Sequence, residues 1–154
     1  MRKKVILTSL IAWVVAVAVG IFLFSAQSGE ESGEISQGLL NGILAFLRLD
    51  GENDETLHYL IRKAAHMMEY AMLGASACVL FFYLADIRIW KGVSRRGMAL
   101  YALAFSALFA VTDEIHQAFV PDRGPAVKDV LIDAAGAAIG IALIYIVGRY
   151  KRER

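Results

Sequence analysis

The chain has 154 residues, of which 58% are hydrophobic, and a formal net charge of +1 at pH 7. A mean hydropathy of +0.54 is too high for an ordinary soluble domain, and we expect a lipid bilayer and no nucleic acid as the partner. The single cysteine, Cys78, excludes an intramolecular disulfide and a cysteine-based zinc cluster, and we interpret it as a packing residue. We therefore expect one domain, residues 1–154, in a membrane.

The first predicted transmembrane helix covers residues 5–24 and follows three basic residues at positions 2–4. About 20 apolar residues are enough for a helix to cross roughly 30 Å of hydrocarbon. A cleaved signal peptide is the alternative, but the apolar core is long for one and no clear cleavage pattern follows it. Ala12, Ala16 and Gly20 recur every four residues, which predicts a stripe that another helix approaches closely.

The segment after this helix is first acidic and then amphipathic. Ser28 and Glu31 fit a capping box that opens a helix. Apolar residues then repeat at helical spacing as far as Leu47, but the segment is too short and too polar to span a bilayer. We expect an extracytoplasmic interfacial helix between the first two membrane helices, followed by a loop over residues 49–54.

Three further membrane helices complete an all-α, integral membrane four-helix bundle. They are predicted at residues 64–85, 98–120 and 127–148. The first of these three begins as a longer helix near Glu55. The next ends at Pro121, and Pro125 suits the first position of the last helix, because proline fits where no backbone N–H is needed.

The distribution of lysine and arginine predicts how the bundle is oriented. Basic residues gather at the N-terminus, in the loop at residues 86–97 and at the C-terminus. The positive-inside rule places all three segments in the cytoplasm, and four crossings make the three assignments agree. The termini are thus expected to be cytoplasmic, while residues 25–60 and the turn at 121–126 are extracytoplasmic.

The unusual polar residues of the membrane helices all lie at this outer level. Spacings of three and four residues place them on shared helix faces. The second helix carries Arg62, His66, Glu69, Leu73 and Ser76 on one face. The third carries Ala102, Ser106, Ala110, Asp113 and Gln117, with His116 at the edge and Glu114 to one side. The fourth carries Asp129, Asp133, Gly136 and Gly140, and the first carries Gly20 and Gln27.

We expect these faces to converge on a polar pocket in the outer leaflet, under the amphipathic segment as a lid. Gly136 and Gly140 form a small-residue pair, so their face of the fourth helix should be packed against neighbours. The alternative is that the polar residues form only a buried network of hydrogen bonds and ion pairs that fixes helix register.

Four ordered motifs resemble the VanZ-like family, and the resemblance covers nearly the whole chain. They are Phe24 to Gln27, Arg62 to Tyr70, Asp113 to Arg123 and Asp129 to Gly136. The resemblance implies a bacterial multi-pass membrane protein of the cell envelope, from a family linked to low-level resistance to the glycopeptide antibiotic teicoplanin and without an established reaction. The resemblance implies that the family's motif residues correspond to Arg62, Lys63, His66, Glu69, Tyr70, Asp113, Glu114, His116, Gln117, Arg123 and Asp129 in this chain.

Two positions depart from the family pattern. Asp122 stands in the turn before Arg123, where family members carry glycine. Asp133 stands where the pattern also admits asparagine, so the charge of Asp133 is not required for a shared activity.

The first functional hypothesis is a non-enzymatic protein that binds or shields a lipidic or cell-wall ligand. Teicoplanin carries an acyl chain and its target is a lipid-linked peptidoglycan precursor, so either could occupy a pocket in the outer leaflet. Guanidinium and ammonium groups suit a phosphate or carboxylate headgroup. The candidate ligand-binding residues are Gln27, Arg62, Lys63, Tyr70, Gln117, Arg123, Asp129 and Asp133.

The second hypothesis is a membrane-embedded hydrolase or group transferase that acts on a lipid or envelope precursor. A histidine near a carboxylate is a common acid–base pair, and two such pairs are spaced three residues apart. The candidate catalytic residues are His66, Glu69, Asp113, Glu114 and His116. The same residues could ligate a divalent metal such as zinc or manganese, although the spacing is a weak signal.

A third hypothesis, a proton-coupled transporter or channel, requires a polar path across the membrane. The third helix before Ser106 and the fourth helix after Gly140 carry no charged residue, so no such path reaches the cytoplasmic side. The oligomeric state is not predicted by the sequence.

Overall fold

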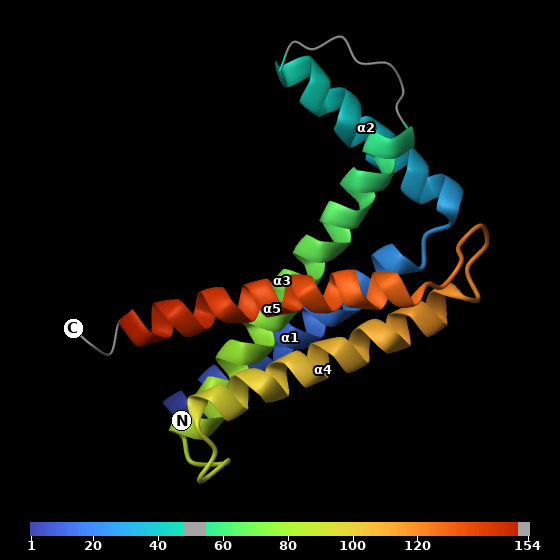
Figure 1. The fold of residues 1–154 in the computed structure, drawn as a ribbon. Coiled ribbons are helices and arrows are strands. Elements are labelled where there is room, and N and C mark those ends of the chain that lie inside the picture. The colour runs from blue at the N-terminus through green and yellow to red at the C-terminus, as the bar shows by residue number, and fades with distance from the viewer. Residues whose placement is uncertain (48–54, 151–154) are drawn as a thin grey trace.

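The computed structural model describes residues 1–47 and 55–150, and over these residues the chain forms five α-helices and no strand (Figure 1). The helices are α1 (Arg2–Ser25), α2 (Gly29–Leu47), α3 (Glu55–Asp86), α4 (Arg95–Gln117) and α5 (Val127–Tyr150). The all-α fold class is therefore confirmed. The loop expected over residues 49–54 lies outside the described residues.

Four of these helices are long and apolar enough to cross a membrane, judged by length and composition. They are α1, the Tyr59–Asp86 part of α3, α4 and α5. The remaining helix, α2, begins with the predicted capping box: the Ser28 backbone N–H donates to Glu31 Oε2 at 2.9 Å, and the Glu31 N–H donates to Ser28 Oγ at 3.2 Å. These reciprocal bonds satisfy N–H groups that the start of a helix leaves without partners.

The start of α4 differs from the prediction, because the helix begins at Arg95 and not at Met98. Ser94 is its N-cap, and the Ser94 side chain accepts a hydrogen bond from the Gly97 N–H at 3.1 Å. A serine at this position stabilises a helix start by about 1 kcal/mol. Two of the four basic residues assigned to the loop at 86–97, Arg95 and Arg96, therefore lie in the first turn of α4.

The end of α4 also differs, because the helix stops at Gln117 and not at Val120. The Val120 N–H donates to the Gln117 carbonyl at 3.1 Å. This bond spans three residues, as in a 3₁₀ turn, and not the four of an α-helix. Val120 precedes Pro121, and a residue before proline is disfavoured in helical conformation. Helix α5 begins at Val127, two residues after Pro125. The prediction that Pro125 occupies the first position of this helix is therefore wrong.

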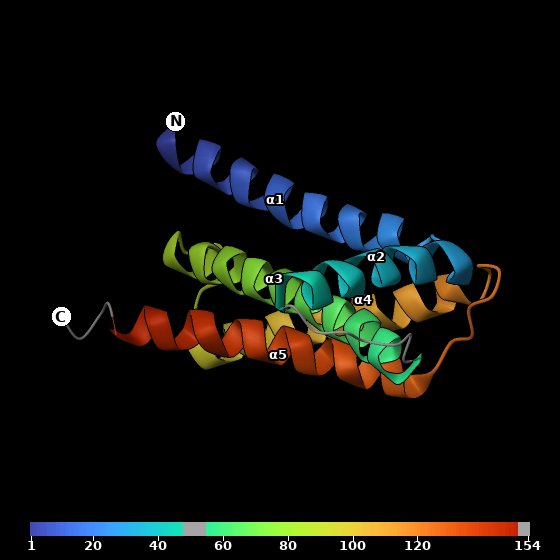
Figure 2. The ribbon, with the colours of Figure 1, turned by 90° about the horizontal axis from the view of Figure 1, so that it is seen from above.

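Among the described helices, α3 alone packs against all four others, as the two views in Figures 1 and 2 indicate. Its closest neighbour is α5. A Cβ atom on Gly136 would overlap the Met67 carbonyl, and one on Gly140 would overlap the Ala71 carbonyl. On the α3 side, a Cβ on Gly74 would lie 2.5 Å from the Ala137 carbonyl oxygen. The predicted packed face of the last helix is confirmed.

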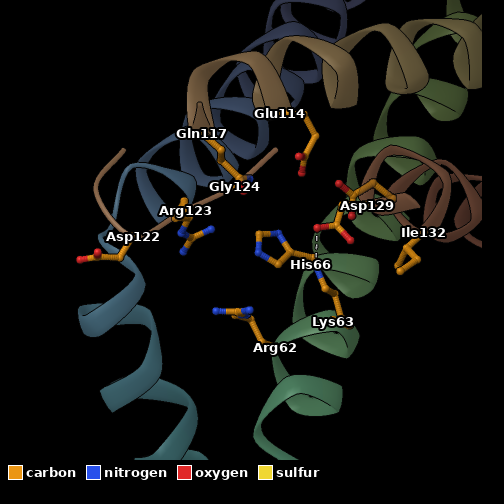
Figure 3. Close-up of a pocket in the computed structure, with 11 residues that line it drawn as sticks. Arg62, Lys63, His66, Glu114, Gln117, Asp122, Arg123, Gly124, Asp129 and Ile132 are labelled. Atoms are coloured by element: carbon orange, nitrogen blue, oxygen red, sulfur yellow. Dashed lines mark ion pairs between the residues drawn. The ribbon is translucent and has the colours of Figure 1, made fainter. Parts of the chain in front are cut away.

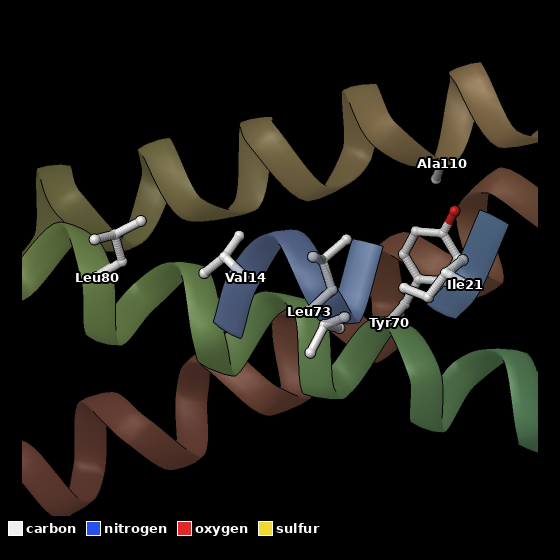
Figure 4. Close-up of a cluster of buried hydrophobic side chains, with 7 residues drawn as sticks. Val14, Ile21, Tyr70, Leu73, Leu80 and Ala110 are labelled. Atoms are coloured by element: carbon white, nitrogen blue, oxygen red, sulfur yellow. The ribbon is translucent and has the colours of Figure 1, made fainter. Parts of the chain in front are cut away.

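Two apolar clusters fill the bundle. The first joins α1, α3 and α4 (Figure 4) and contains Val14, Val17, Ile21, Tyr70, Leu73, Leu80 and Ala110. The second joins α3, α4 and α5 and contains Ala77, Cys78, Phe82, Met98, Ala102 and Ile141. Cys78 is fully buried there, which agrees with its interpretation as a packing residue.

The small-residue stripe predicted for the first helix does not form a contact. Ala12 and Ala16 are exposed, and no atom lies within 4 Å of a Cβ built on Gly20. Helix α1 instead packs through larger side chains, which hold it further from its neighbours. Trp13 provides a polar link, because its Nε1–H donates to Ser76 Oγ on α3 at 3.0 Å.

The two ends of the bundle differ in chemistry. The start of α1, the α3–α4 connection and the end of α5 lie at one end, and these are the basic segments of the chain (Figures 1 and 2). The α1–α2 and α4–α5 connections lie at the opposite end (Figure 2). The polar residues singled out in the sequence gather at that second end.

Candidate functional site

A polar cavity of about 70 Å³ lies where the first half of α3, the end of α4 and the start of α5 meet the α4–α5 turn (Figure 3). It is lined by Arg62, Lys63, His66, Glu114, Gln117, Asp122, Arg123, Gly124, Asp129, Ile132 and Asp133. A buried water needs roughly 10 to 15 Å³ on this measure, so the cavity has room for several waters or one small oxyanion.

Two carboxylates of the polar cavity are already engaged by the protein. Asp129 on α5 forms an ion pair with Lys63 on α3, and both side chains are mostly buried. Glu114 on α4 accepts a hydrogen bond from the Ala126 N–H at 2.9 Å, just before α5 begins. These two contacts fix the start of α5 against α3 and α4. Asp133 lies one turn further along α5 and is 3% exposed.

The two guanidinium groups of the polar cavity, unlike its two engaged carboxylates, have no ion-pair partner among the described residues. Arg62 from α3 and Arg123 from the α4–α5 turn lie on the same side of the polar cavity as the His66 imidazole (Figure 3). In the described part of the chain no carboxylate oxygen lies within 4.0 Å of either guanidinium, and the buried Arg123 Nε has no hydrogen-bond partner. Burial, together with the positive charge of Arg62, lowers the pKa of the Arg123 guanidinium from its ordinary value.

The α4–α5 turn that carries Arg123 depends on an uncommon backbone conformation. Asp122 has a φ of 58°, in the left-handed region. Glycine adopts this region without strain, and aspartate is among the few other residues that tolerate it. A glycine at this position would therefore adopt the same turn without strain. Asp122, Gly124 and Ile132 also line the polar cavity and were missed as site residues, although the Asp-Arg-Gly turn was a usable signal.

Asp113 lies behind the polar cavity and does not line it. It is 1% exposed, and its Oδ2 accepts a hydrogen bond from Gln117 Nε2 at 3.2 Å. The hydroxyl groups of Ser25 on α1 and Tyr70 on α3 lie beside the same carboxylate. Polar side chains from three helices therefore surround this carboxylate. Ser25, missed as a site residue, is fully buried there, and its place in the Phe24 to Gln27 motif was the available signal.

His116 and Asp113 were expected to point to one spot, but the two side chains form no hydrogen bond or ion pair with each other. The His116 ring stacks on Phe22 of α1, with ring centroids 4.0 Å apart and an interplanar angle of 23°. His116 lines neither cavity described here. The helical spacing was correct, but residues three apart on a helix differ by about 60° in direction, which is enough to face different neighbours.

His66 and Glu69 are brought together, with 3.6 Å between His66 Nδ1 and Glu69 Oε2. His66 lines the polar cavity, whereas Glu69 lines a second cavity of about 130 Å³ between α1, α2 and α3. We call this second cavity the apolar groove. It is lined by Phe24, Gln27, Ser32, Ile35, Ser36, Leu39, Ile61, Arg62, Ala65, His66, Glu69 and Arg123.

Two expectations about the N-terminal part of the chain differ from the structure. Gln27 lies in the α1–α2 connection and not on a face of the first helix, because α1 ends at Ser25. Helix α2 contributes none of the described residues that line the polar cavity, so these residues do not form the lid expected there. The helix forms a wall of the apolar groove instead.

No group of three or more His, Cys, Asp or Glu side chains in the described residues is arranged to hold a metal ion. Asp129, which lines the same cavity as His66, is engaged by Lys63. The site thus combines one ion pair, Lys63 with Asp129, and two guanidinium groups that have no carboxylate partner among the described residues.

Comparison with known proteins gives one finding. The model of the VanZ/LLP1 family matches residues 10–148 of the chain. Searches of curated proteins and of solved structures give no significant match.

Proposed function

The chain belongs to the VanZ/LLP1 family, and from this premise we propose that it is a multi-pass membrane protein that binds the anionic headgroup of a lipid or lipid-linked cell-wall precursor. The observation that carries the proposal is the pair of guanidinium groups, Arg62 and Arg123, which face the polar cavity without a carboxylate partner in the described residues. Guanidinium groups bind phosphate and carboxylate through two parallel hydrogen bonds.

The polar cavity opens on the extracytoplasmic side in this proposal. The support is the concentration of lysine and arginine at the other end of the bundle, which the positive-inside rule assigns to the cytoplasm. Bound precursor headgroups are less available to teicoplanin, so the protein contributes to teicoplanin resistance by shielding.

The proposal is tested with the full chain in nanodiscs of zwitterionic phosphatidylcholine, using calorimetric titration with methyl phosphate. Arg62→Gln and Arg123→Gln each remove a charge-assisted hydrogen-bond donor worth about 1.5 to 3 kcal/mol. We expect each to weaken binding at least tenfold. The matched control is Arg96→Gln, an exposed arginine at the opposite end, which should bind as the wild type does. Equal affinity in all four proteins contradicts the proposal.

The same variants connect binding to resistance. Cells that produce Arg123→Gln should be more susceptible to teicoplanin than cells that produce Arg96→Gln at the same protein level. Equal susceptibility would separate headgroup binding from resistance and contradict the shielding role.

A second candidate function is favoured by the His66–Glu69 pair. A carboxylate 3.6 Å from an imidazole that lines a cavity suits general acid–base catalysis of hydrolysis or group transfer. Lipid and precursor profiling compares cells with the wild type, His66→Gln and, as a control, His116→Gln, whose ring lies outside both cavities. A species that changes with the wild type and His116→Gln but not with His66→Gln supports an enzyme. An unchanged profile contradicts it.

A further inference from the structure

The polar cavity and the apolar groove share a wall. Arg62, His66 and Arg123 line both of them. A group that is held between the two guanidinium groups is therefore also at the entrance of the apolar groove. The polar cavity offers cationic and hydrogen-bonding groups, and the apolar groove offers mainly hydrocarbon surface. An amphiphile has the same two parts, a polar headgroup and a hydrocarbon chain.

The size and lining of the apolar groove suit a short stretch of hydrocarbon. Its apolar side chains come from three helices: Phe24 from α1, Ile35 and Leu39 from α2, and Ile61 and Ala65 from α3. Its volume is about 130 Å³. An apolar cavity of about 150 Å³ in another protein stays dry and binds benzene, so a groove of this size has room for a few methylene groups.

The groove is open along one edge, which gives a longer chain a way out. Phe24, Ile35 and Leu39 line the groove and are nevertheless 54%, 54% and 52% exposed. Large apolar side chains that stay exposed beside a cavity are typical of a membrane or ligand contact. A hydrocarbon chain that enters the groove at its polar end can therefore continue past these residues into the bilayer.

The wall formed by α2 is fixed in place beside the arginine that the two cavities share. The Gly29 N–H donates to the Pro121 carbonyl at 3.2 Å, and the Gly29 Cα lies so close to Asp122 that a Cβ would overlap its carbonyl oxygen. Further along α2, Leu40 is buried at 2% exposure. The start of α2 and the turn carrying Arg123 thus form one unit.

We propose that the ligand is a phosphate-bearing amphiphile whose phosphate lies between Arg62 and Arg123 and whose first methylene groups pass His66 into the apolar groove. The inference rests on the proposed function for the headgroup and adds the hydrocarbon chain. It distinguishes an alkyl phosphate from free phosphate, because only the alkyl phosphate fills the groove.

The test compares methyl phosphate with butyl phosphate on the full chain in phosphatidylcholine nanodiscs, by calorimetric titration. Both probes carry the same headgroup, and butyl phosphate adds three methylenes. Their complete burial from water would tighten binding roughly sixty-fold, and in a groove with an open edge we expect about tenfold. Ala65→Phe fills the groove and should abolish this gain while leaving methyl phosphate binding unchanged.

The matched control is Ala64→Phe, which places the same side chain one residue away at an exposed position of α3 and should retain the gain. Ile35→Asn tests the α2 wall at a half-exposed position and should reduce the gain without loss of helical content by circular dichroism. Equal affinity of the wild type for the two probes, or a gain that survives Ala65→Phe, overturns the inference and leaves headgroup binding intact. Failure of methyl phosphate to bind the wild type overturns the proposed function itself, and this inference with it.

Discussion

Helices α5 and α1 both present small residues every four positions, yet only α5 uses them to approach α3. Gly136 and Gly140 of α5 meet backbone carbonyls of α3, whereas Gly20 of α1 meets nothing within 4 Å. The difference lies in the partner. Where α3 faces α5 it contributes Gly74, and where it faces α1 it contributes large side chains such as Leu73. In this bundle the close crossing occurs where the opposite helix also contributes a glycine, Gly74.

The largest test of this comparison is Gly140→Ala. The added methyl group would overlap the Ala71 carbonyl, so α5 and α3 must move apart. Overpacking of this kind costs typically 1 to 3 kcal/mol, and we expect about 3 kcal/mol because the clash is with backbone. Thermal unfolding of the purified protein should show a melting temperature about 6 to 12 °C lower. An unchanged melting temperature would refute the close contact between α3 and α5.

Gly29→Ala extends the comparison to the start of α2. Its methyl group would overlap the Asp122 carbonyl, so we expect a loss of about 1 to 2 kcal/mol. The displaced turn carries Arg123, and methyl phosphate binding should weaken with it. Gly33→Ala is the matched control on the same helix, because its Cβ meets no atom within 4 Å. That control should be neutral or stabilising, since alanine favours helix more than glycine does.

Trp13→Phe tests what attaches α1 in the absence of a close crossing. It removes the hydrogen bond to Ser76 and keeps an aromatic ring in place. Interhelical hydrogen bonds of this kind contribute about 0.6 kcal/mol on average in a membrane protein. A double-mutant cycle with Ser76→Ala should give a coupling free energy of that size. A coupling of zero would mean that apolar packing alone holds α1.

Gly20→Ala should have the smallest effect. The position has open space around it, so the free energy of unfolding should change by no more than about 0.5 kcal/mol. The shift in melting temperature should be correspondingly small. A loss as large as that of Gly140→Ala would show that the stripe on α1 does make a contact, for instance with a second copy of the chain in the membrane.

Much of the fold followed from local patterns in the sequence. The apolar runs predicted the four long helices, and the capping box at Ser28 and Glu31 predicted the start of α2. The stripe on α4 from Ala102 to Gln117 is buried as its spacing predicted. These features depend on residues close together in the sequence, which is why the pattern was sufficient.

The arrangement of the site could be predicted only in part. Spacing placed Asp113 and His116 on neighbouring faces of one helix, but not the Ser25 and Tyr70 hydroxyls beside Asp113 or the Phe22 ring under His116. These neighbours come from other helices, and helical periodicity carries no information about the separation or rotation of two helices. The division into two cavities, with Arg123 between them, likewise depends on how the α4–α5 turn folds back.

The complete burial of Cys78 makes the natural chain suitable for thiol labelling. A membrane-impermeant maleimide should leave the wild type unmodified, since this is the only cysteine and its side chain is 0% exposed. Single cysteines then report on each end of the bundle without any change to the native thiol. In intact cells Asp122→Cys, in the turn beside the polar cavity, should be labelled. Lys91→Cys, at the basic end, should be labelled only after the cells are opened.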